Sequence, residues 1–445
     1  MNRRRFLHHS AWLAAGAIAA PALFSSCKKT NLFESESFSG EVIVVGAGIA
    51  GLYAAELLIQ QGVNVRIIES TNRWGGRMRS LPNITNDRLN IEQRTVQGQF
   101  SALYDLLINK NVSLQEPPLQ ELFYFNGRLN TPQEATQNTF FLEMLNVIAG
   151  FNNYSGADIS ALDYYNALNM SENTTHIFNV LTGQVHGTSS DHISGVGLAK
   201  QHHVWTAGDK KFRVSTEAIE RACANAFARA INTITYDTSI ASIDYTQSKI
   251  NITSSTGEAW TCDKVLVTVP LDVLKNGSIA FTPSLGDKQI QALSRISIDH
   301  SYCALMKLDT PQWPLGTTRI YGSGIVQCFD VNDDGWIYAE ASGTQADTIS
   351  SIFGETLDIF KNQLDNILPG AAAHIIEGYV QQWNGNRSFD APGIGNSRAT
   401  LAESIGEKLY FAGEATHTGG HHGTLHGAME TGWRAVYQML EKSAS

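Results

Sequence analysis

Short hydrophobic runs rich in β-branched residues occur near the start of the chain and again past its middle. Val42–Val45 and Val65–Ile68 flank a segment, Ile49–Gln61, that we interpret as a helix, and a third run spans Val265–Val269. Runs of this kind are typical of parallel strands that are buried on both faces. The pattern therefore predicts a β-α-β unit over Glu41–Arg77 and a further buried strand at 265–269.

Elsewhere the runs give way to alternation and to amphipathic periodicity. Ile250 and Ile252 alternate with polar residues and precede a turn at Ser254–Gly257, which predicts a strand and a hairpin turn. Phe100–Lys110 predicts an amphipathic helix. The remaining predicted elements are an aromatic strand at Leu122–Phe125, a turn at Asn126-Gly127, a helix at Phe140–Ala149, and strands within Arg295–Trp313, at Gly378–Trp383 and at Lys408–Ala412.

The turn after the first strand has the spacing of a dinucleotide-binding loop. Gly46, Gly48 and Gly51 form a GxGxxG pattern, in which the glycines allow a tight turn, a close pyrophosphate and close helix packing. The helix directs its first N–H groups towards an anion bound at this turn. Glu69 ends the second strand, where a carboxylate accepts from the 2′-hydroxyl of an unphosphorylated ribose. The predicted cofactor contacts in this region are Gly46, Ala47, Gly48, Ile49, Ala50, Gly51, Glu69 and Ser70.

The continuation, Arg73-Trp74-Gly75-Gly76-Arg77, resembles the flavin-containing amine oxidase family, which includes monoamine, polyamine and L-amino-acid oxidases. The resemblance covers most of residues 40–445 and is strongest at the two ends. It implies that Gly75, Gly76 and Arg77 approach the FAD pyrophosphate. It also implies that Ile240 supplies a backbone contact to the adenine.

A second cofactor motif lies near the end of the chain. The strand at 408–412 leads into Gly413 and Glu414, and Thr424 and Leu425 open a helix that continues to about Leu440. By resemblance, Glu414 binds the ribityl and pyrophosphate region, while Thr424 and Leu425 lie at the flavin pyrimidine edge. A helix N-terminus aimed there stabilises the negative charge that reduction places on the flavin.

Several positions depart from the family pattern at the expected active site. Cys303 stands where the family carries a lysine linked to reaction with oxygen, and Lys307 is about 13 Å further along the same strand. Gly395 and Thr424 replace two aromatic rings that steer the amine. Ile394 replaces the cysteine that attaches flavin in some members, so the resemblance predicts non-covalent FAD. Trp383 matches a family tryptophan beside the flavin.

Two predictions concern the substrate side of the flavin. Glu92-Gln93 replaces a small-residue pair, and a glutamate at the flavin edge would repel a reduced, anionic flavin. Arg94 is close to where some amino-acid oxidases hold the substrate carboxylate, which a guanidinium can clamp bidentately. An exposed arginine at a strand end is the alternative.

Histidines near the second motif raise the question of a metal. His422 and His426 are spaced i, i+4, and His421 is adjacent, but a helix N-terminus is unfavourable for a cation and no acidic residue is expected nearby. We therefore predict no metal, and we expect His426 to contact substrate or flavin. Cys223, Cys262, Cys303 and Cys328 lack metal or disulfide spacing and are expected to be free thiols.

The amino terminus has the features of an export signal. Asn2–Leu7 (NRRRFL) matches a twin-arginine signal, and Ala11–Phe24 is too short for a permanent membrane helix. Leu23–Cys27 resembles a lipoprotein cleavage box. We expect a signal at residues 1–27, a tether at 28–39, and a protein on the periplasmic side, anchored by lipid at Cys27. An ordinary cleaved signal peptide is the alternative.

Length and charge limit the partners. The chain has 445 residues and a net charge of -10, and it lacks a basic stripe with interleaved aromatic residues, so a nucleic-acid partner is not expected. A small-molecule substrate and an electron acceptor, oxygen or another carrier, are expected. The sequence does not indicate the oligomeric state.

The sequence thus predicts an α/β fold with a discontinuous, Rossmann-like FAD-binding domain (40–115, 230–285 and 376–445) and a mixed α+β substrate-binding domain (116–229 and 286–375). The resemblance implies oxidation of a C–N bond in an amine or amino acid by hydride transfer to flavin N5. The alternatives are an FAD-dependent dehydrogenase or desaturase that acts on another donor without oxygen, and a surface lipoprotein that keeps the fold for binding alone.

Overall fold

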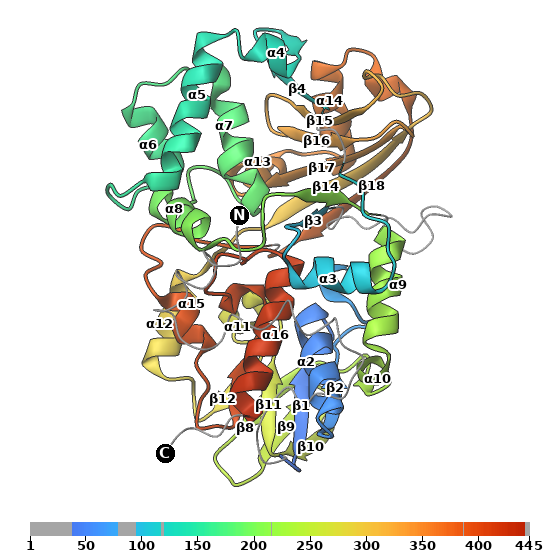
Figure 1. Ribbon diagram of the computed structural model, residues 1–445, viewed down its shortest axis with the longest axis vertical. Helices are drawn as coiled ribbons and strands as arrows, with labels where there is room; N and C mark the ends of the chain where they lie inside the picture. The colour runs from blue at the N-terminus through green and yellow to red at the C-terminus, as the bar shows by residue number, and fades with distance from the viewer. Residues whose placement is uncertain (1–37, 79–94, 117–119, 215, 386, 441–445) are drawn as a thin grey trace.

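The computed structural model describes residues 38–78, 95–116, 120–214, 216–385 and 387–440, which form two lobes (Figure 1). Residues of both lobes line one cavity. The export signal, the tether up to residue 37, Glu92-Gln93 and Arg94 lie outside these residues. Within them, no helix is long and apolar enough to span a bilayer.

The first lobe is built on a parallel five-stranded sheet. Its strand order is β20 (Leu409–Phe411), β11 (Lys264–Val267), β1 (Glu41–Val45), β2 (Asn64–Ile68) and β7 (Ile234–Thr235). Val42 and Val44 point to one face of β1 and Ile43 and Val45 to the other, and all four are buried. This burial on both faces explains the hydrophobic runs in the sequence.

Helices cover one face of the parallel sheet. They are α2 (Ile49–Gln60), α3 (Ala102–Asn109), α9 (Thr216–Ala226), α10 (Ala228–Ile231) and α16 (Leu425–Leu440). The helices α2 and α16 pack closely because Gly432 has no side chain. A Cβ at this position would lie 2.6 Å from the carbonyl oxygen of Ala50. The two ends of the chain are therefore joined in one core, as the predicted discontinuous domain requires.

A smaller sheet and short helices cover the other face. The sheet contains β10 (Ala259–Cys262), β9 (Ile250–Ser254), β8 (Ile240–Asp244) and β12 (Ala280–Thr282). The helices are α11 (Leu271–Lys275), α12 (Asp287–Arg295) and α15 (Ser397–Ala402). The alternating residues Ile250 and Ile252 are buried in this layer, and their strand pairs antiparallel with β8 and β10.

The second lobe is built on a seven-stranded sheet. Its strand order is β18 (Ile375–Trp383), β14 (Ser301–Leu308), β17 (Trp336–Ser342), β16 (Cys328–Val331), β15 (Thr317–Tyr321), β4 (Gln120–Phe125) and β5 (Arg128–Asn130). The helices α13 (Thr344–Ser351) and α14 (Thr356–Ile367) pack with one face. A bundle that includes α5 (Thr139–Gly150), α6 (Ala161–Ala167) and α7 (Thr175–Thr182) packs near β4, and α8 (Gly195–Val204) leads back towards the first lobe (Figure 1).

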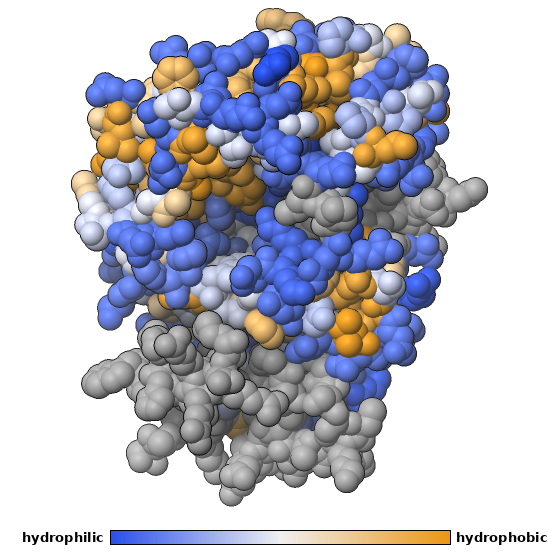
Figure 2. Space-filling view, turned by 45° about the horizontal axis from the view of Figure 1, so that its top comes forward, coloured by the Kyte–Doolittle hydropathy of each residue, from blue (hydrophilic) through white to orange (hydrophobic). Residues whose placement is uncertain are grey.

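Hydrophobic side chains also reach the surface of this second lobe. Figure 2 shows hydrophobic areas in its upper half, separated by hydrophilic ones. Phe140 and Leu142, both on α5, are among the exposed large hydrophobic residues. In this view the exposed apolar side chains do not form one continuous face.

Most predicted elements are confirmed. The predicted helices at 49–61, 100–110 and 140–149 correspond to α2, α3 and α5. Asn126 and Gly127 both have positive φ angles and connect β4 to β5, as expected of a tight hairpin turn. The four described cysteines are free.

The predicted domain boundaries differ from the sheets in two places. The boundary at residue 376 cuts through β18, which pairs along its length with β14 and belongs to the second lobe. The segments of α9 and α12, which were assigned to the substrate domain, pack in the two cores of the parallel sheet. Sheet membership and helix packing depend on partners that are distant in sequence, which local patterns do not reveal.

Candidate cofactor and active site

A cavity of about 630 Å³ lies where the carboxyl ends of the parallel strands face the second lobe. This edge of a doubly wound sheet is where such folds bind ligands. The cavity is lined by these residues predicted to contact the cofactor: Gly46, Gly48, Ile49, Ala50, Glu69, Ser70, Gly75, Gly76, Arg77, Ile240, Gly413, Glu414, Thr424 and Leu425. The structure thus brings both glycine-acid motifs to one site.

Each glycine of the first turn has a separate role. Gly46 has a φ of +108°, and a Cβ there would lie 2.8 Å from Thr268 Oγ1. A Cβ on Gly51 would lie 2.2 Å from the carbonyl oxygen of Gly46, so this glycine lets α2 approach the turn. A Cβ on Gly48 would meet no protein atom within 4 Å. Gly48 therefore faces open cavity, as a backbone that approaches a pyrophosphate should.

Glu69 also holds the first turn in place. One of its carboxylate oxygens accepts from the backbone N–H of Ala47 at 2.8 Å, and the other accepts from the N–H and hydroxyl of Thr71 at 3.0 and 2.8 Å. Ala47 itself is buried and does not line the cavity. Glu69 thus lines the cavity in a fixed orientation, with lone pairs remaining for a ribose hydroxyl.

Glu414 lies at the second motif and is nearly fully buried. It accepts hydrogen bonds from the N–H and hydroxyl of Ser388 at 3.3 and 2.6 Å and from the N–H of Gly423 at 2.8 Å, and it lies 3.5 Å from Arg77. Arg398, which sequence reasoning missed, donates to Ser388 Oγ at 2.8 Å and pairs with Asp390 at 2.7 Å. This network fixes Glu414 beside the arginine of the first motif.

These residues fit FAD. An open glycine backbone, a ribose-binding carboxylate and an arginine line one cavity, and α16 begins at its wall. The 16-residue helix α16 places its positive end there, where a flavin gains negative charge on reduction. Thr424 closes the first turn of this helix, since its hydroxyl donates to the carbonyl of His421 and accepts from the N–H of Gly427.

The second lobe forms the opposite wall, which we call the sheet wall: Tyr338 and Glu340 on β17, Trp383 at the end of β18, and Arg387 just beyond it. Glu340 accepts from Arg387 at 2.7 Å, from the Ser342 hydroxyl at 2.8 Å and from the Tyr338 hydroxyl at 3.1 Å. Burial, followed by the nearby Cys303 and Glu340, raises the pKa of Tyr338 well above its usual value, so Tyr338 stays protonated.

Of the sheet wall, sequence reasoning found only Trp383. The alternation along β17, with Ile337, Ala339 and Ala341 buried in the core, is a signal that would have placed Tyr338 and Glu340 on the opposite face.

Cys303 lies behind the sheet wall. It is fully buried, does not line the cavity, and accepts a hydrogen bond from the Tyr338 hydroxyl at 3.3 Å. Lys307 lies further along β14, where it donates to the carbonyl of Asp334 and contacts the Trp336 ring. Among the described residues, no lysine lines the cavity.

Gly395 lies away from the site. It is exposed in the turn before α15, has a φ of +53°, and does not line the cavity, so its predicted place in the substrate pocket is not supported. The adjacent Ile394 is buried in the core beneath the parallel sheet.

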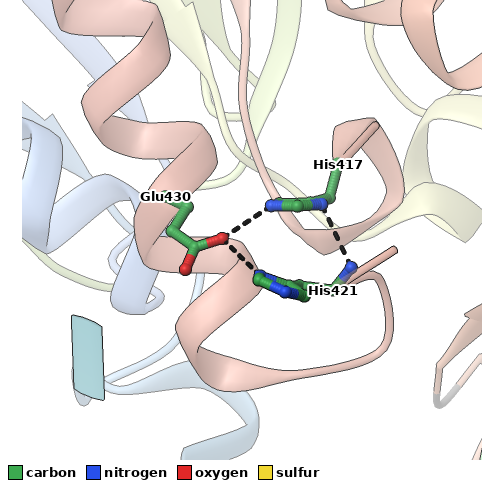
Figure 3. A group of neighbouring side chains, drawn as sticks. All are labelled: His417, His421 and Glu430. Atoms are coloured by element: carbon green, nitrogen blue, oxygen red, sulfur yellow. Dashed lines mark hydrogen bonds and ion pairs between the residues drawn. The ribbon is translucent and has the colours of Figure 1, made fainter. Parts of the chain in front are cut away.

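His426 lines the cavity, but its neighbours differ from those expected. The helix begins at Leu425, so His422 and His426 are not one turn apart on a helix. The expectation of no nearby acidic residue was wrong, because Glu430 on α16 accepts hydrogen bonds from His417 Nε2 and His421 Nδ1, each at 2.7 Å (Figure 3). We call His417, His421 and Glu430 the histidine-glutamate cluster.

The protons of this cluster are assigned by its other hydrogen bonds. His417 Nδ1 accepts from the N–H groups of Gly419 and His421 at 3.0 and 3.2 Å, and His421 Nε2 accepts from the N–H of Thr206 at 3.2 Å. The nitrogens that face Glu430 therefore carry the protons. A metal ion would need lone pairs at those atoms, so the arrangement opposes metal binding although the three ligand atoms lie within 4.8 Å of one another.

Electrostatics agree with a neutral imidazole at His417 and a carboxylate at Glu430. Burial raises the pKa of Glu430, but the hydrogen bonds from His417 and His421 outweigh it and leave the pKa well below its usual value. Burial, aided by the neighbouring His421 and Arg434, lowers the pKa of His417 although Glu430 raises it.

Comparison with known proteins agrees with this geometry. The Flavin containing amine oxidoreductase family matches residues 49–440. Polyamine oxidase 2 of Arabidopsis thaliana is 24% identical, over 92% of this chain and 90% of its own length. Lysine-specific histone demethylase 1 homolog 2 of Oryza sativa subsp. japonica is 23% identical over 92% of this chain, and the chain spans 58% of that relative.

A solved putrescine oxidase variant has the same fold. Its TM-score is 0.75 at 19% identity, over 89% of this chain and 98% of that chain. The family match covers both glycine-acid motifs apart from Gly46 and Gly48, and it includes the whole sheet wall. The chain belongs to the flavin-containing amine oxidoreductase family, and its cofactor is FAD.

Proposed function

We propose that this protein oxidises the C–N bond of an amine or amino acid. The observation that carries the proposal is one cavity that joins the two FAD motifs to a wall of tyrosine, tryptophan and glutamate side chains. The names of the relatives, a polyamine oxidase and a putrescine oxidase, support an amine as the donor. When bound, FAD accepts a hydride at N5 from the carbon next to the nitrogen.

The residues of the first lobe would hold FAD along the sheet edge. Glu69 would accept from the adenosine ribose, Ile240 would contact the adenine, and Gly48 and Arg77 would face the pyrophosphate. Leu425 would lie at the pyrimidine edge. No described cysteine lines the cavity, which supports non-covalent binding.

The sheet wall would orient the donor. Trp383 and Tyr338 offer aromatic surface, and the carboxylate of Glu340 accepts hydrogen bonds directly from Tyr338 and Arg387. The substrate would arrive as a neutral amine, lose its C–H hydride and release an N–H proton to water. The C=N product would then be hydrolysed in solution to a carbonyl compound and an amine or ammonia.

The charges of the wall favour an amine without a carboxylate. Arg77 and Arg387 are the arginines among the described lining residues, and each is paired with a glutamate. A guanidinium already held by a carboxylate offers less to a second one. Polyamines and simple amines are therefore preferred over amino acids in this proposal, with Arg94 as the residue that could reverse the preference.

Anaerobic mixing of the holoprotein with a panel of amines, polyamines and amino acids tests the function. An active donor removes the visible absorbance of oxidised FAD without oxygen present. Substrates with a carboxylate should bleach the flavin more slowly than matched amines. If no member of the panel bleaches bound FAD, the binding-only alternative replaces this proposal.

A second candidate function is an FAD-dependent dehydrogenase or desaturase that acts on another donor and passes its electrons to an acceptor other than oxygen. No lysine among the described residues lines the cavity, and Cys303 is buried behind Tyr338, which supports an acceptor other than oxygen. Reduced holoprotein exposed to air distinguishes the two. Slow reoxidation without peroxide supports a dehydrogenase, whereas fast reoxidation with peroxide supports an oxidase.

The proposed location is the periplasmic side, with a lipid anchor at Cys27. The sequence at residues 2–7 and 23–27 supports it. Fractionation of cells that express the chain and a Cys27→Ala variant tests the anchor. The wild-type protein should partition with membranes and the variant should not.

A further inference from the structure

His426 is a buried polar side chain that the proposed chemistry leaves without a task. It is the second residue of α16, lines the cavity and is only 2% exposed. Within the part of the chain that the structure describes, neither ring nitrogen forms a hydrogen bond; Nε2 is enclosed by protein atoms, whereas Nδ1 is not, so Nδ1 is the nitrogen that a ligand in the cavity can reach. An unpaired polar atom of a buried side chain is costly unless a ligand completes it.

The position of His426 along the cavity selects which part of FAD it meets. Glu69 follows β2 and Glu414 follows β20, so the two acids stand on opposite sides of β1 in the parallel sheet. A dinucleotide with its adenosine at Glu69 extends across the sheet towards Glu414. α16 follows Glu414, and its first turn therefore faces the flavin end.

The ring of His426 is held by two aromatic neighbours. Its centroid lies 5.6 Å from that of Trp205, at an interplanar angle of 85°, and 4.8 Å from that of His421, at 63°. Trp205 follows α8 and is itself fixed by a hydrogen bond from its indole N–H to the carbonyl of Gly208 at 2.8 Å. Two segments that are distant in the sequence thus contribute to the orientation of His426.

The histidine-glutamate cluster fixes one of these neighbours. His421 donates to Glu430 through Nδ1 and accepts from the N–H of Thr206 through Nε2, so its ring has hydrogen bonds on both sides. Glu430 stands four residues after His426 on α16, on the same side of the helix. Glu430 therefore acts on His426 through the His421 ring.

The protonation state of His426 follows from this environment. Burial, and then the neighbouring His421, lower the pKa of His426 to about 3. A neutral imidazole has one N–H donor and one acceptor nitrogen. The polar edge of an isoalloxazine ring likewise carries several acceptors and one N–H donor, so the two edges are complementary.

We propose that His426 is a hydrogen-bond partner of the isoalloxazine ring of FAD and that Glu430, acting through His421, is the residue that positions it. The inference rests on FAD binding and not on the identity of the substrate. In this proposal His426 and His421 neither bind a metal nor transfer a proton.

The test measures FAD itself in the absence of substrate. His426→Phe keeps an aromatic ring against Trp205 and His421 and removes both nitrogens. We expect the dissociation constant of FAD to rise about tenfold, the size of one hydrogen bond, with a shift in the flavin absorption bands and reduction potential. His426→Gln, which keeps a donor and an acceptor, should restore much of the affinity. If His426→Phe retains wild-type affinity, spectrum and potential, the proposal is overturned.

Two further variants separate this role from loop packing. Glu430→Gln retains the shape of the cluster with a weaker acceptor, and it should shift the potential in the same direction as His426→Phe, with an affinity loss of about threefold. If the flavin potential is unchanged in Glu430→Gln, Glu430 does not position His426. If His426→Phe does not fold, this result also overturns the proposal. His422→Phe is the control, because His422 is also buried, in the loop that leads into α16, but does not line the cavity. Equal changes in His422→Phe and His426→Phe overturn the proposal.

Discussion

The two walls of the cavity are constructed by different means. The wall of the first lobe consists of turns and helix N-termini, in which backbone groups and glycines face the cofactor. The sheet wall consists of side chains from β17, β18 and the segment after it, and these strands belong to a sheet whose members are spread over the second lobe. Cofactor binding therefore depends on local backbone conformation, whereas substrate orientation depends on tertiary pairing.

The strongest test of the backbone wall is Gly51→Ala. A Cβ would lie 2.2 Å from a backbone oxygen, which no side-chain movement relieves, so α2 must shift away from the turn. We expect the free energy of unfolding of the protein without FAD to fall by about 3 kcal/mol, at the upper end for overpacking. Chemical denaturation measures it, and an unchanged midpoint would contradict the close packing of α2.

Gly48→Ala is the matched substitution in the same turn. Gly48 has a φ of -72°, which alanine adopts readily, and its Cβ would meet no protein atom. We expect stability without FAD to be unchanged within about 0.5 kcal/mol, as for a substitution free of strain. The added methyl group enters the space for the pyrophosphate, so FAD affinity should fall by at least about tenfold. Retained affinity would show that the cofactor does not pass over Gly48.

On the sheet wall, Glu340→Gln should affect the reaction and leave FAD in place. The amide keeps one acceptor oxygen but loses the charge that holds Arg387 at 2.7 Å. Removing one partner of a partly buried pair leaves the other uncompensated. We expect flavin reduction by an amine to slow about tenfold, equivalent to about 1.4 kcal/mol.

Stopped-flow reduction and a separate FAD titration make that measurement. Ser342→Ala is the control, because it removes a neutral donor to the same carboxylate. Loss of FAD affinity in Glu340→Gln would mean that the sheet wall also contributes to cofactor binding.

The protonation of His426, on the wall of the first lobe, gives a further test. The pKa of His426 is lowered to about 3 from 6.5, so its neutral form is favoured in the folded protein. Its stabilising contribution is fully present above pH 6.5 and is lost as the pH falls towards 3. As the pH falls from 6.5 to 5, the loss in the free energy of unfolding from this single group should steepen from about 0.7 to about 1.4 kcal/mol per pH unit. Denaturation across this range should show a shallower slope in His426→Phe, and an identical slope would contradict the buried neutral imidazole.

These contrasts follow what the sequence could reveal. The GxGxxG turn, Glu69 and Glu414 were found because each lies at the end of a hydrophobic run whose burial is visible in the run itself. Tyr338 was missed because the alternation along β17 was not used, and Arg387 was missed because its pairing with Glu340 forms only when β17 and β18 join one sheet. The Glu430 hydrogen bonds were missed because they form only when the loop that holds His417 and His421 folds back against α16. Gly395 was misplaced because a loop position was assigned by matching and has no pattern to constrain it.

The smallest expected effect concerns Cys303, which matched a family lysine position but lies behind the sheet wall. Cys303→Ala removes one acceptor of the Tyr338 hydroxyl, yet that hydroxyl also donates to Glu340 at 3.1 Å. We expect a stability loss of about 1 kcal/mol from the small cavity and no change in the rates of flavin reduction or reoxidation. Rapid mixing of reduced protein with oxygen measures the second rate. Because Tyr338 separates Cys303 from the cavity, a changed reoxidation rate would mean that Tyr338 transmits the substitution to the flavin, and the sheet wall would then control the electron acceptor as well as the donor.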